Sequence, residues 1–398
     1  MKVQPSQIDP PVNILLLCEG DAETWDSWSG STRSLLEHLR ADGIAVTVGD
    51  VNPRGAGRYL VALQSFSSDR RRWWARYHLG AAGFQARSKR AALILAAQVT
   101  PPDVILQIGA TFRLPDDTGV PYALYCDSNI EQAQEGASSG FSDASVLTPD
   151  EFGAIRKREA DVYHGATRIF TISECLRRSF LDQFGVESGR VETVYAGPNF
   201  THGRAPDVPE RPAHAPPVIL FVGRAFHRKG GDLLVRAFAQ VRVALPDARL
   251  IVIGPDTPPP ETQQVAGITC LGFIDKDSAA GRQRLLDAYA QSKVFCLPTR
   301  FEPFGVVFLE AMHYELPVVA PAAWAVAEIV EDGVTGTLVP PDDVEALAAA
   351  LIHLLSDSER ALRMGVAGKR RLEAQFTWAL VAHRIGRALE LVTRSRPQ

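Results

Sequence analysis

Cysteine is scarce in this sequence and is never paired. The 398 residues hold five cysteines, each isolated from the others, and no Cys-x-x-Cys pair occurs. A disulfide framework or a zinc site needs cysteines at paired spacings, so we expect neither. Isolated thiols suit a reducing compartment, and we expect the protein in the cytoplasm. The five are Cys18, Cys126, Cys175, Cys270 and Cys296.

Long apolar runs are also missing. No run reaches the roughly 18 apolar residues that a membrane-spanning helix requires. The first apolar run, residues 12–18, ends at Glu19 and is shorter than the core of a signal peptide. We therefore expect neither a signal peptide nor a membrane span.

The sequence has no excess of positive charge. Its formal net charge is −4, whereas nucleic-acid-binding domains are usually strongly basic, so no nucleic-acid partner is expected. Hydrophobic residues make up 46% and charged residues 22%, which is typical of a globular protein. At roughly 100–200 residues per domain, a chain of this length indicates two or three domains.

Short apolar runs rich in Val, Ile and Leu alternate with helical patterns. Such runs are typical of strands buried on both faces of a parallel sheet. The pattern occurs twice, and residues 201–217, which hold five prolines, interrupt it as a linker. The strands expected in the first array are residues 12–18, 44–48, 104–108, 122–125, 168–172 and 191–195. Those expected in the second are residues 218–222, 250–253, 268–271, 294–297, 318–320 and 337–339.

Two such arrays predict an α/β protein with two doubly wound, Rossmann-like domains facing each other across a cleft. The first would comprise residues 1–200 and the second residues 218–377. Ligands of such sheets bind beyond the carboxyl ends of the strands, which places the expected site in the cleft. Residues 378–398 include an amphipathic helix that can pack on either domain and so cross back to the first.

A basic loop follows the expected strand at residues 218–222. Gly223 permits a tight turn, and Arg224 and Lys229 then project from a strand-to-helix loop. A guanidinium fork and an ammonium group can hold a diphosphate there, assisted by amides at the helix N-terminus. A basic surface loop with a helix cap is the alternative interpretation.

A second loop, after residues 294–297, carries Glu302 and leads into a helix at Gly305, and Glu310 lies inside that helix. Glycine lets a ligand approach the backbone, and the amides beyond it favour a phosphate. Glu310 is flanked by apolar residues, where an unpaired charge would be costly, and a pair of ribose hydroxyls would satisfy it. Glu302 can bond sugar hydroxyls. The alternatives are a helix cap for Glu302 and a basic partner for Glu310.

Three features together resemble one enzyme family. They are Glu302 and Glu310 separated by seven residues, Gly-Arg…Lys-Gly at residues 223–230, and Pro-Val-Val-Ala at residues 317–320. The chain resembles the retaining glycosyltransferases of the GT4 family, most strongly over residues 218–339. The resemblance implies the GT-B fold and transfer of a sugar from a nucleoside-diphosphate sugar, a UDP- or GDP-sugar. The acceptor would be a hydroxyl of a glycan, a lipid-linked sugar or a small molecule, and no cofactor would be required.

The resemblance also implies roles for single residues. Arg224 and Lys229 would hold the donor diphosphate and stabilise the leaving group, and Glu310 would bind the ribose. Phe273 and Ile274 would lie beside the base. The donor sugar and phosphate would be held by Glu302 and by the backbone of Phe304, Gly305 and Val306.

The N-terminal half departs from the family pattern. In place of the usual glycine-rich loop after the first strand, Gly30 and Ser31 open a helix after a longer stretch. We expect them to face a phosphate, with a plain helix cap as the alternative. Where many relatives carry a histidine that meets the donor sugar, this chain reads Tyr-Cys-Asp-Ser-Asn at residues 125–129. Asp127 is the candidate catalytic replacement.

Asp275 and Asp277 match the Asp-x-Asp pattern that binds manganese in the other major glycosyltransferase fold. Because Arg224 and Lys229 already supply positive charge for a diphosphate, we interpret the two acids as a loop or helix-start pair. No metal is expected.

The segment from Arg70 to Tyr77 interleaves basic and aromatic side chains. Trp and Tyr suit a lipid interface and Arg suits anionic headgroups, so a peripheral contact at the inner membrane surface is one interpretation. The other is a surface helix with two core tryptophans.

Two rival functions stay open. Another enzyme of the same fold type, such as a nucleotide-sugar epimerase, is one, and a catalytically inactive scaffold that binds partners is the other. A dinucleotide oxidoreductase is not expected, because no Gly-x-Gly-x-x-Gly follows an expected strand.

Overall fold

The computed structural model describes residues 12–25, 27–200, 207–208, 216–276 and 278–394. Most of the expected linker, 201–217, therefore lies outside the described residues, as does Asp277. Within the described part of the chain, no helix combines the length and the apolar character needed to cross a membrane.

The first half is built on a parallel sheet of six strands. Its order is β2-β1-β3-β4-β5-β6, and each neighbouring pair is parallel. Every residue of the central strand β3 is buried, as expected for an apolar run covered on both faces. The strands are β1 (Asn13–Cys18), β2 (Ala45–Asp50), β3 (Val104–Ile108), β4 (Tyr122–Cys126), β5 (Arg168–Thr171) and β6 (Val191–Thr193).

A second parallel sheet of six strands forms the other half, in the order β12-β11-β10-β7-β8-β9. Each of the twelve expected strands is present within one or two residues of its expected ends. The strands are β7 (Val218–Val222), β8 (Arg249–Ile253), β9 (Ile268–Gly272), β10 (Val294–Cys296), β11 (Val318–Pro321) and β12 (Gly336–Val339).

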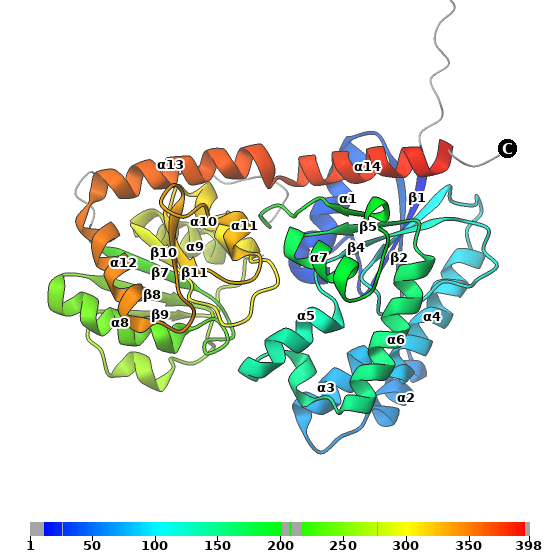
Figure 1. The fold of residues 1–398 in the computed structure, drawn as a ribbon, viewed down its shortest axis with the longest axis horizontal. Coiled ribbons are helices and arrows are strands. Elements are labelled where there is room, and N and C mark those ends of the chain that lie inside the picture. The colour runs from blue at the N-terminus through cyan, green and yellow to red at the C-terminus, as the bar shows by residue number, and fades with distance from the viewer. Residues whose placement is uncertain (1–11, 26, 201–206, 209–215, 277, 395–398) are drawn as a thin grey trace, which may run out of the picture.

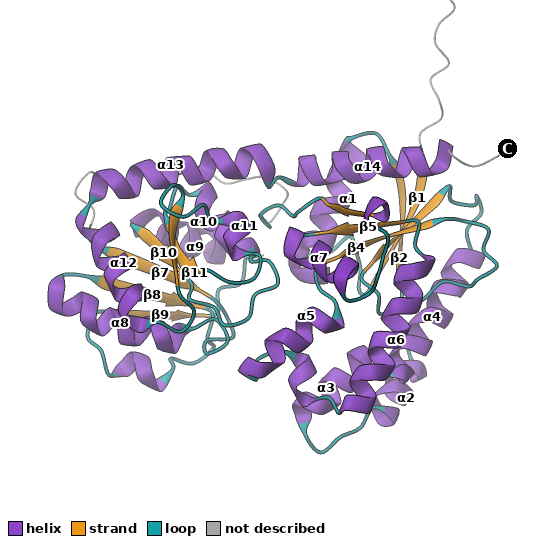
Figure 2. Ribbon diagram, in the orientation of Figure 1, coloured by secondary structure: helices purple, strands orange, loops and turns teal. Residues whose placement is uncertain are grey.

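Helices cover the sheets, as Figure 2 shows. The first half holds α1 (Ser31–Ala41), α2 (Ala56–Gln64), α3 (Arg70–Leu79), α4 (Ala81–Ala96), α5 (Ile130–Glu135), α6 (Pro149–Gly165) and α7 (Glu174–Asp182), with single turns η1 (Ser27–Gly30), η2 (Gly136–Ser139), η3 (Asp143–Val146) and η4 (Ser188–Arg190). The second half holds α8 (Gly231–Ala244), η6 (Pro260–Gln263), α9 (Ala279–Gln291), α10 (Val306–His313), α11 (Val326–Ile329), α12 (Val344–Ser356) and α13 (Ser358–Gln375).

The last helix, α14 (Trp378–Arg394), returns to the first half. It continues from α13 along one side of the molecule and packs against α1 (Figure 1). At its start, the Trp378 indole Nε1 donates to the backbone oxygen of Pro198 at 3.2 Å and to Asn199 Oδ1 at 3.1 Å. Of the two packing partners that the sequence allowed for this helix, the fold uses the first half.

The two halves meet at loops that follow strand ends in both sheets. Phe301, after β10, lies so close to Gly136 that a Cβ on this glycine would be 2.3 Å from the Phe301 ring. Glu328 in α11 accepts two hydrogen bonds of 2.7 Å from the backbone amides of Glu174 and Cys175, which begin α7. The carboxyl ends of the two sheets therefore face each other, as the sequence predicts.

Candidate functional site

Two loops at the carboxyl ends of β7 and β10 are joined by hydrogen bonds. The Arg300 amide donates to the Arg228 oxygen at 3.0 Å, and the Arg228 guanidinium donates to the Phe301 oxygen at 3.0 Å. Gly230 has a φ of 72°, and a Cβ there would lie 1.9 Å from the backbone oxygen of Pro298. Because only glycine permits this approach, the two loops form a single continuous surface.

Lys229 and Glu302 form an ion pair across this surface, and both side chains are largely buried. Burial, followed by the nearby charge of Arg228, lowers the pKa of the Lys229 ammonium to about 7. The Glu302 carboxylate opposes that shift because it favours the charged lysine. The structure thus pairs Lys229, the residue expected to bind the diphosphate, with Glu302, the residue expected to bind the sugar.

Arg224 lies at the rim of the site. Its guanidinium is 3.3 Å from Asp256 Oδ2 and stacks over the Phe273 ring, with 5.1 Å between the guanidinium carbon and the ring centroid. Phe273 is exposed while its neighbour Ile274 is buried. The backbone of Gly223 is approached closely by Gly254, where a Cβ would meet it at 2.5 Å. The residues expected beside the base and at the diphosphate are therefore neighbours.

The N-terminus of α10 opens beside these loops. Gly305 precedes it with a φ of 104°, and no side chain caps the first turn. Phe304 is buried, which anchors the loop beneath the helix start. Amides in the first turn of a helix attract anions, so the backbone from Gly305 to Val307 is suited to a phosphate group.

Glu310 lies in the middle of α10 with only 5% of its surface exposed. Lys276 Nζ, from the loop after β9, is 2.9 and 3.1 Å from its two carboxylate oxygens. The Tyr289 hydroxyl donates to the same carboxylate at 3.5 Å. Burial, and then the Glu310 charge, raises the pKa of Tyr289 well above its usual range, which keeps this hydroxyl a donor. Glu310 thus has a basic partner, as one interpretation of the sequence allowed.

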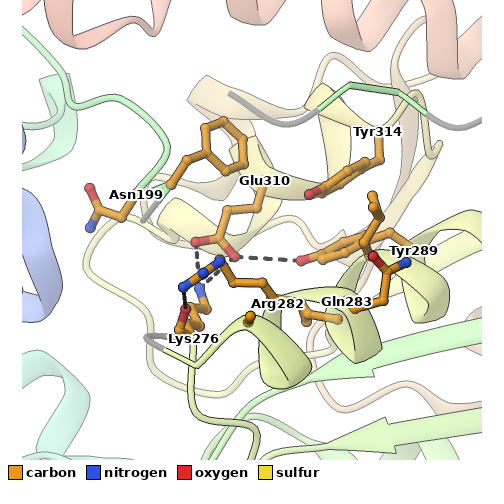
Figure 3. A pocket seen from close by; sticks show the side chains of 11 residues that line it. Asn199, Lys276, Arg282, Gln283, Tyr289, Glu310 and Tyr314 are labelled. Carbon is orange, nitrogen blue, oxygen red and sulfur yellow. Dashed lines mark hydrogen bonds and ion pairs between the residues drawn. The ribbon is translucent and has the colours of Figure 1, made fainter. Parts of the chain in front are cut away.

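A cavity of about 290 Å³ lies beside Glu310. Figure 3 shows the carboxylate at its centre, with Lys276 and Arg282 below it and Tyr289 and Tyr314 to one side. The wall also includes Asn199, which comes from the segment joining the two halves. A ligand in this cavity would meet aromatic faces and one carboxylate held by a long cationic side chain, which suits hydroxyl groups on a ring.

The candidate residues of the first half form a separate cluster. The Trp28 indole Nε1 donates to Asp127 Oδ2 at 2.6 Å, and burial raises the pKa of Asp127. Trp28, Ser29 and Gly30 all have positive φ values, of 50°, 55° and 89°. A left-handed backbone costs free energy at the two non-glycine residues, Trp28 and Ser29, and such strain clusters at functional sites.

Ser31, at the start of α1, is bonded to the segment that joins the two halves. Asn199 Nδ2 donates at 2.9 Å to the Ser31 hydroxyl and at 2.9 Å to the Ser29 oxygen. The Asn199 side-chain oxygen in turn accepts from Trp378. These bonds link the expected phosphate-facing turn to α14, and the phosphate role of Gly30 and Ser31 stays a prediction.

Sequence reasoning missed several residues of the site. Lys276 is the middle residue of the Asp-x-Asp pattern, which draws attention only to the two acids, and its pairing with Glu310 depends on how the loop after β9 meets α10. Trp28, Tyr289 and Asn199 belong to no sequence motif, and only their polar side-chain atoms could have marked them as candidates. Among the described residues, no group of three or more His, Cys, Asp or Glu side chains could share a metal ion.

Comparison with known proteins gives a partial sequence match. Residues 216–357 match the family model described as glycosyl transferases group 1. A GDP-mannose-dependent monoacylated alpha-(1-6)-phosphatidylinositol monomannoside mannosyltransferase from Corynebacterium glutamicum is 31% identical over 186 residues. That match covers 44% of this chain and 47% of the relative, so the chain spans about half the length of curated relatives it matches. Both loops of the site and Glu310 lie within the family match.

Solved structures match over nearly the whole chain. Sucrose-phosphate synthase from Thermosynechococcus elongatus superimposes with a TM-score of 0.69 at 20% identity, covering 97% of this chain and 100% of that one. The chain has the GT-B fold. The Anabaena protein HepE, solved in complex with UDP and glucose, superimposes with a TM-score of 0.57 at 17% identity, covering 95% and 99%. The fold class predicted from the sequence is confirmed.

Proposed function

We propose that this GT-B protein is a retaining glycosyltransferase of the GT4 type. It would transfer a sugar from a nucleoside-diphosphate sugar to a hydroxyl of a glycan, a lipid-linked sugar or a small molecule. The observation that carries this proposal is a pair of glutamate–lysine contacts, Glu302–Lys229 and Glu310–Lys276, on either side of the open N-terminus of α10.

Each of the two ion pairs contains a charged side chain that could bind part of a nucleoside-diphosphate sugar. A diphosphate between the loops would take up the Lys229 ammonium and the amides beyond Gly305, which leaves Glu302 free to accept sugar hydroxyls. Ribose hydroxyls in the cavity would bond the Glu310 carboxylate, which Lys276 also contacts. Phe273 at the rim, under Arg224, offers an aromatic face to the base.

Cleavage of the bond between the sugar C1 and the phosphate oxygen builds negative charge on the departing diphosphate. With the diphosphate held between the two loops, Lys229, Arg224 and the α10 amides would lie near that developing charge and would stabilise the transition state more than the bound donor. The acceptor hydroxyl would attack from the same face, with its proton passing to the leaving phosphate. Asp127, on the first half, is the proposed group that meets the donor sugar.

Neither loop identifies the sugar or the base of the donor, and the names of the similar proteins point to different donors. The Corynebacterium relative is named for GDP-mannose, whereas HepE was solved with UDP and glucose. We propose a UDP- or GDP-sugar donor used without a metal ion or cofactor. The proposal that no metal ion is used rests on the positive charge that Lys229 and Arg224 would bring to the diphosphate.

A thermal-shift panel tests the donor site. UDP, GDP and ADP are each added to the wild type, Arg224→Ala and Glu310→Ala, with Arg236→Ala and Glu345→Ala as controls on exposed positions of α8 and α12. One nucleotide should raise the melting temperature of the wild type and the controls, and the shift should shrink by more than half in the two site variants. If no nucleotide stabilises the wild type, the proposed function is wrong. If one does, but Arg224→Ala and Glu310→Ala respond like the controls, the residue roles are wrong.

Donor turnover separates the enzyme from its rivals. A transferase hydrolyses the donor slowly when no acceptor is present, and the products are the nucleoside diphosphate and the free sugar. An inactive scaffold would release neither, and an epimerase would change the sugar while the donor stays intact. Either of these outcomes, seen with the nucleotide that gives the thermal shift, would replace the proposal.

A further inference from the structure

The helices α2 and α3 and the loop between them carry a cluster of exposed apolar side chains, which we call the α2–α3 face. Of the thirteen large hydrophobic side chains exposed in the described chain, six lie within residues 59–74, so the exposure is local. Leu63 is 74% exposed and Trp74 61% exposed. The two tryptophans are therefore not core residues, contrary to one interpretation of the sequence. The face consists of Tyr59, Leu60, Leu63, Phe66, Trp73 and Trp74.

The α2–α3 face is held in shape by its own contacts. The Trp73 indole Nε1 donates to the backbone oxygen of Ala62 at 2.9 Å, which ties α3 to the end of α2. The Trp73 and Phe66 rings meet edge to face with centroids 5.9 Å apart. Because these rings stay exposed although fixed in place, they form a preorganised apolar surface.

Positive charge is concentrated around this face. Residues 54–90 hold nine Lys and Arg residues and a single acid, Asp69, in a chain whose net charge is −4. Asp69 is used within the helix, where its carboxylate accepts from the Arg71 and Arg72 amides. Arg58 and Arg70 are exposed beside the apolar side chains. Four of the nine bases pair with acids from outside this range, namely Arg54 with Asp50, Arg72 and Arg76 with Glu151, and the buried Arg87 with Glu19. The exposed positive charge of α2 and α3 therefore comes from Arg58, Arg70 and Arg71.

The combination selects one kind of partner. A second copy of the chain would bring the same basic cluster against itself, and like charges in contact are costly. The anionic headgroups of a bilayer attract Lys and Arg side chains. The interface just below the headgroups accommodates Trp, Tyr and Leu side chains. We propose that the α2–α3 face docks this protein on an anionic lipid surface.

The face adjoins the acceptor side of the candidate site. Arg71 Nη2 donates to the Gly140 oxygen at 2.9 Å, in the loop between η2 and η3. The turn η2 begins at Gly136, which contacts Phe301 in the second loop of the site. Figure 1 shows α2 and α3 on the side of the first half opposite α14, below α5 and α6. Resting on the proposed function, this arrangement makes the acceptor a hydroxyl on a lipid-linked molecule delivered from that surface.

Vesicle flotation tests the proposal. The full chain is mixed with vesicles of pure phosphatidylcholine or of phosphatidylcholine with phosphatidylglycerol, and the floated fraction is measured at low and high salt. We expect flotation with the anionic vesicles, loss of it at high salt, and about a tenfold lower partition coefficient for Leu63→Ala/Trp74→Ala. The matched control is Val243→Ala/Leu362→Ala, which removes two exposed apolar side chains elsewhere and should float like the wild type.

Three results would overturn the proposal. They are equal flotation with neutral and anionic vesicles, an equal loss in the control pair, and a dimer in light scattering that Leu63→Ala/Trp74→Ala dissociates. Nucleotide thermal shifts of the Leu63→Ala/Trp74→Ala variant keep the two proposals apart. If vesicles bind but no nucleotide stabilises any variant, the lipid surface stands and the transferase function fails.

Discussion

Each glutamate of the loop-to-helix segment holds a lysine that comes from another loop. Glu302 contacts Lys229 and Glu310 contacts Lys276, and both glutamates are nearly fully buried. A buried carboxylate without a partner would cost several kcal/mol, so a countercharge was required by the apolar surroundings alone. The sequence predicted the two acids and one lysine as ligands. It could not predict which lysine meets which acid, because the pairs join residues 73 and 34 positions apart.

The lowered pKa of Lys229 predicts a pH dependence of donor binding. With a pKa of about 7 in the free protein, the lysine is charged below pH 7 and progressively neutral above it. A bound diphosphate favours the charged form and raises the pKa of Lys229, so the lysine itself causes no loss of affinity below pH 7, where only the terminal phosphate of the ligand, with a pKa of about 6, titrates. Above pH 7, the affinity should fall by at most about tenfold per pH unit. Nucleoside-diphosphate titrations by calorimetry from pH 6 to 9, in buffers of different ionisation enthalpy, would measure the proton taken up.

Lys229→Arg is the matched variant for this prediction. Arginine keeps its charge at every pH in the range, so proton uptake on binding should disappear even if affinity is reduced. Proton uptake that persists in Lys229→Arg would assign the titration to another group. An affinity independent of pH in the wild type would mean that Glu302 keeps the lysine charged throughout.

At the scale of elements, the strands and the site loops differ in how they are specified. Apolar runs located the twelve strands because burial on both faces of a parallel sheet leaves a local pattern. The contact between the loops after β7 and β10 leaves little such trace. It depends on Gly230, whose backbone touches Pro298, and a glycine at this place in a sequence can equally serve a turn or a helix start.

Gly230→Ala should disrupt this loop contact. The added Cβ would meet the Pro298 oxygen at 1.9 Å and would also need a left-handed backbone at 72°, so we expect a loss of about 2–4 kcal/mol in stability. A fall in melting temperature of roughly 5 °C or more should follow, together with weaker nucleotide binding. Thermal unfolding and the nucleotide panel measure both effects.

Gly333→Ala provides the control for Gly230→Ala. Gly333 has a similar φ of 73°, but a Cβ there meets nothing within 4 Å. Its substitution should cost about 1 kcal/mol from backbone strain alone and leave nucleotide binding unchanged. Equal losses in the two variants would show that the approach to Pro298 does not hold the loops together.

At the scale of the whole molecule, two contacts set how the halves sit. The carboxylate of Glu328 receives the first amides of α7, as a capping side chain would, although it belongs to the opposite half. Trp378 and Asn199 bind α14 to the segment between the halves and, through Ser31, to the start of α1. If the two halves move apart, the hydrogen bonds of Glu328 and of Asn199 must either break or act as the hinge of that movement.

Removing the Glu328 side chain should loosen the two halves. Glu328→Ala leaves the amides of Glu174 and Cys175 without this acceptor, which should cost about 1 kcal/mol and favour a more open arrangement. Small-angle scattering should show a larger radius of gyration than in the wild type. Glu331→Ala, which removes a half-exposed partner of Arg371 nearby, should leave the radius unchanged. An identical radius in both variants and the wild type would mean that Glu328 does not restrain the halves.

Local pattern was enough to place the strands, the break between two α/β arrays and the two glutamates at a helix start, because burial and helix entry act on neighbours in the chain. Three features required the folded molecule: the lysine that each glutamate holds, the exposure of Trp73 and Trp74, and the return of α14 to the first half. Each is decided by which surfaces meet across long sequence separations. An unpaired buried charge or an uncovered apolar face is costly unless another part of the chain covers it. Which part of the chain does so is determined by the tertiary fold.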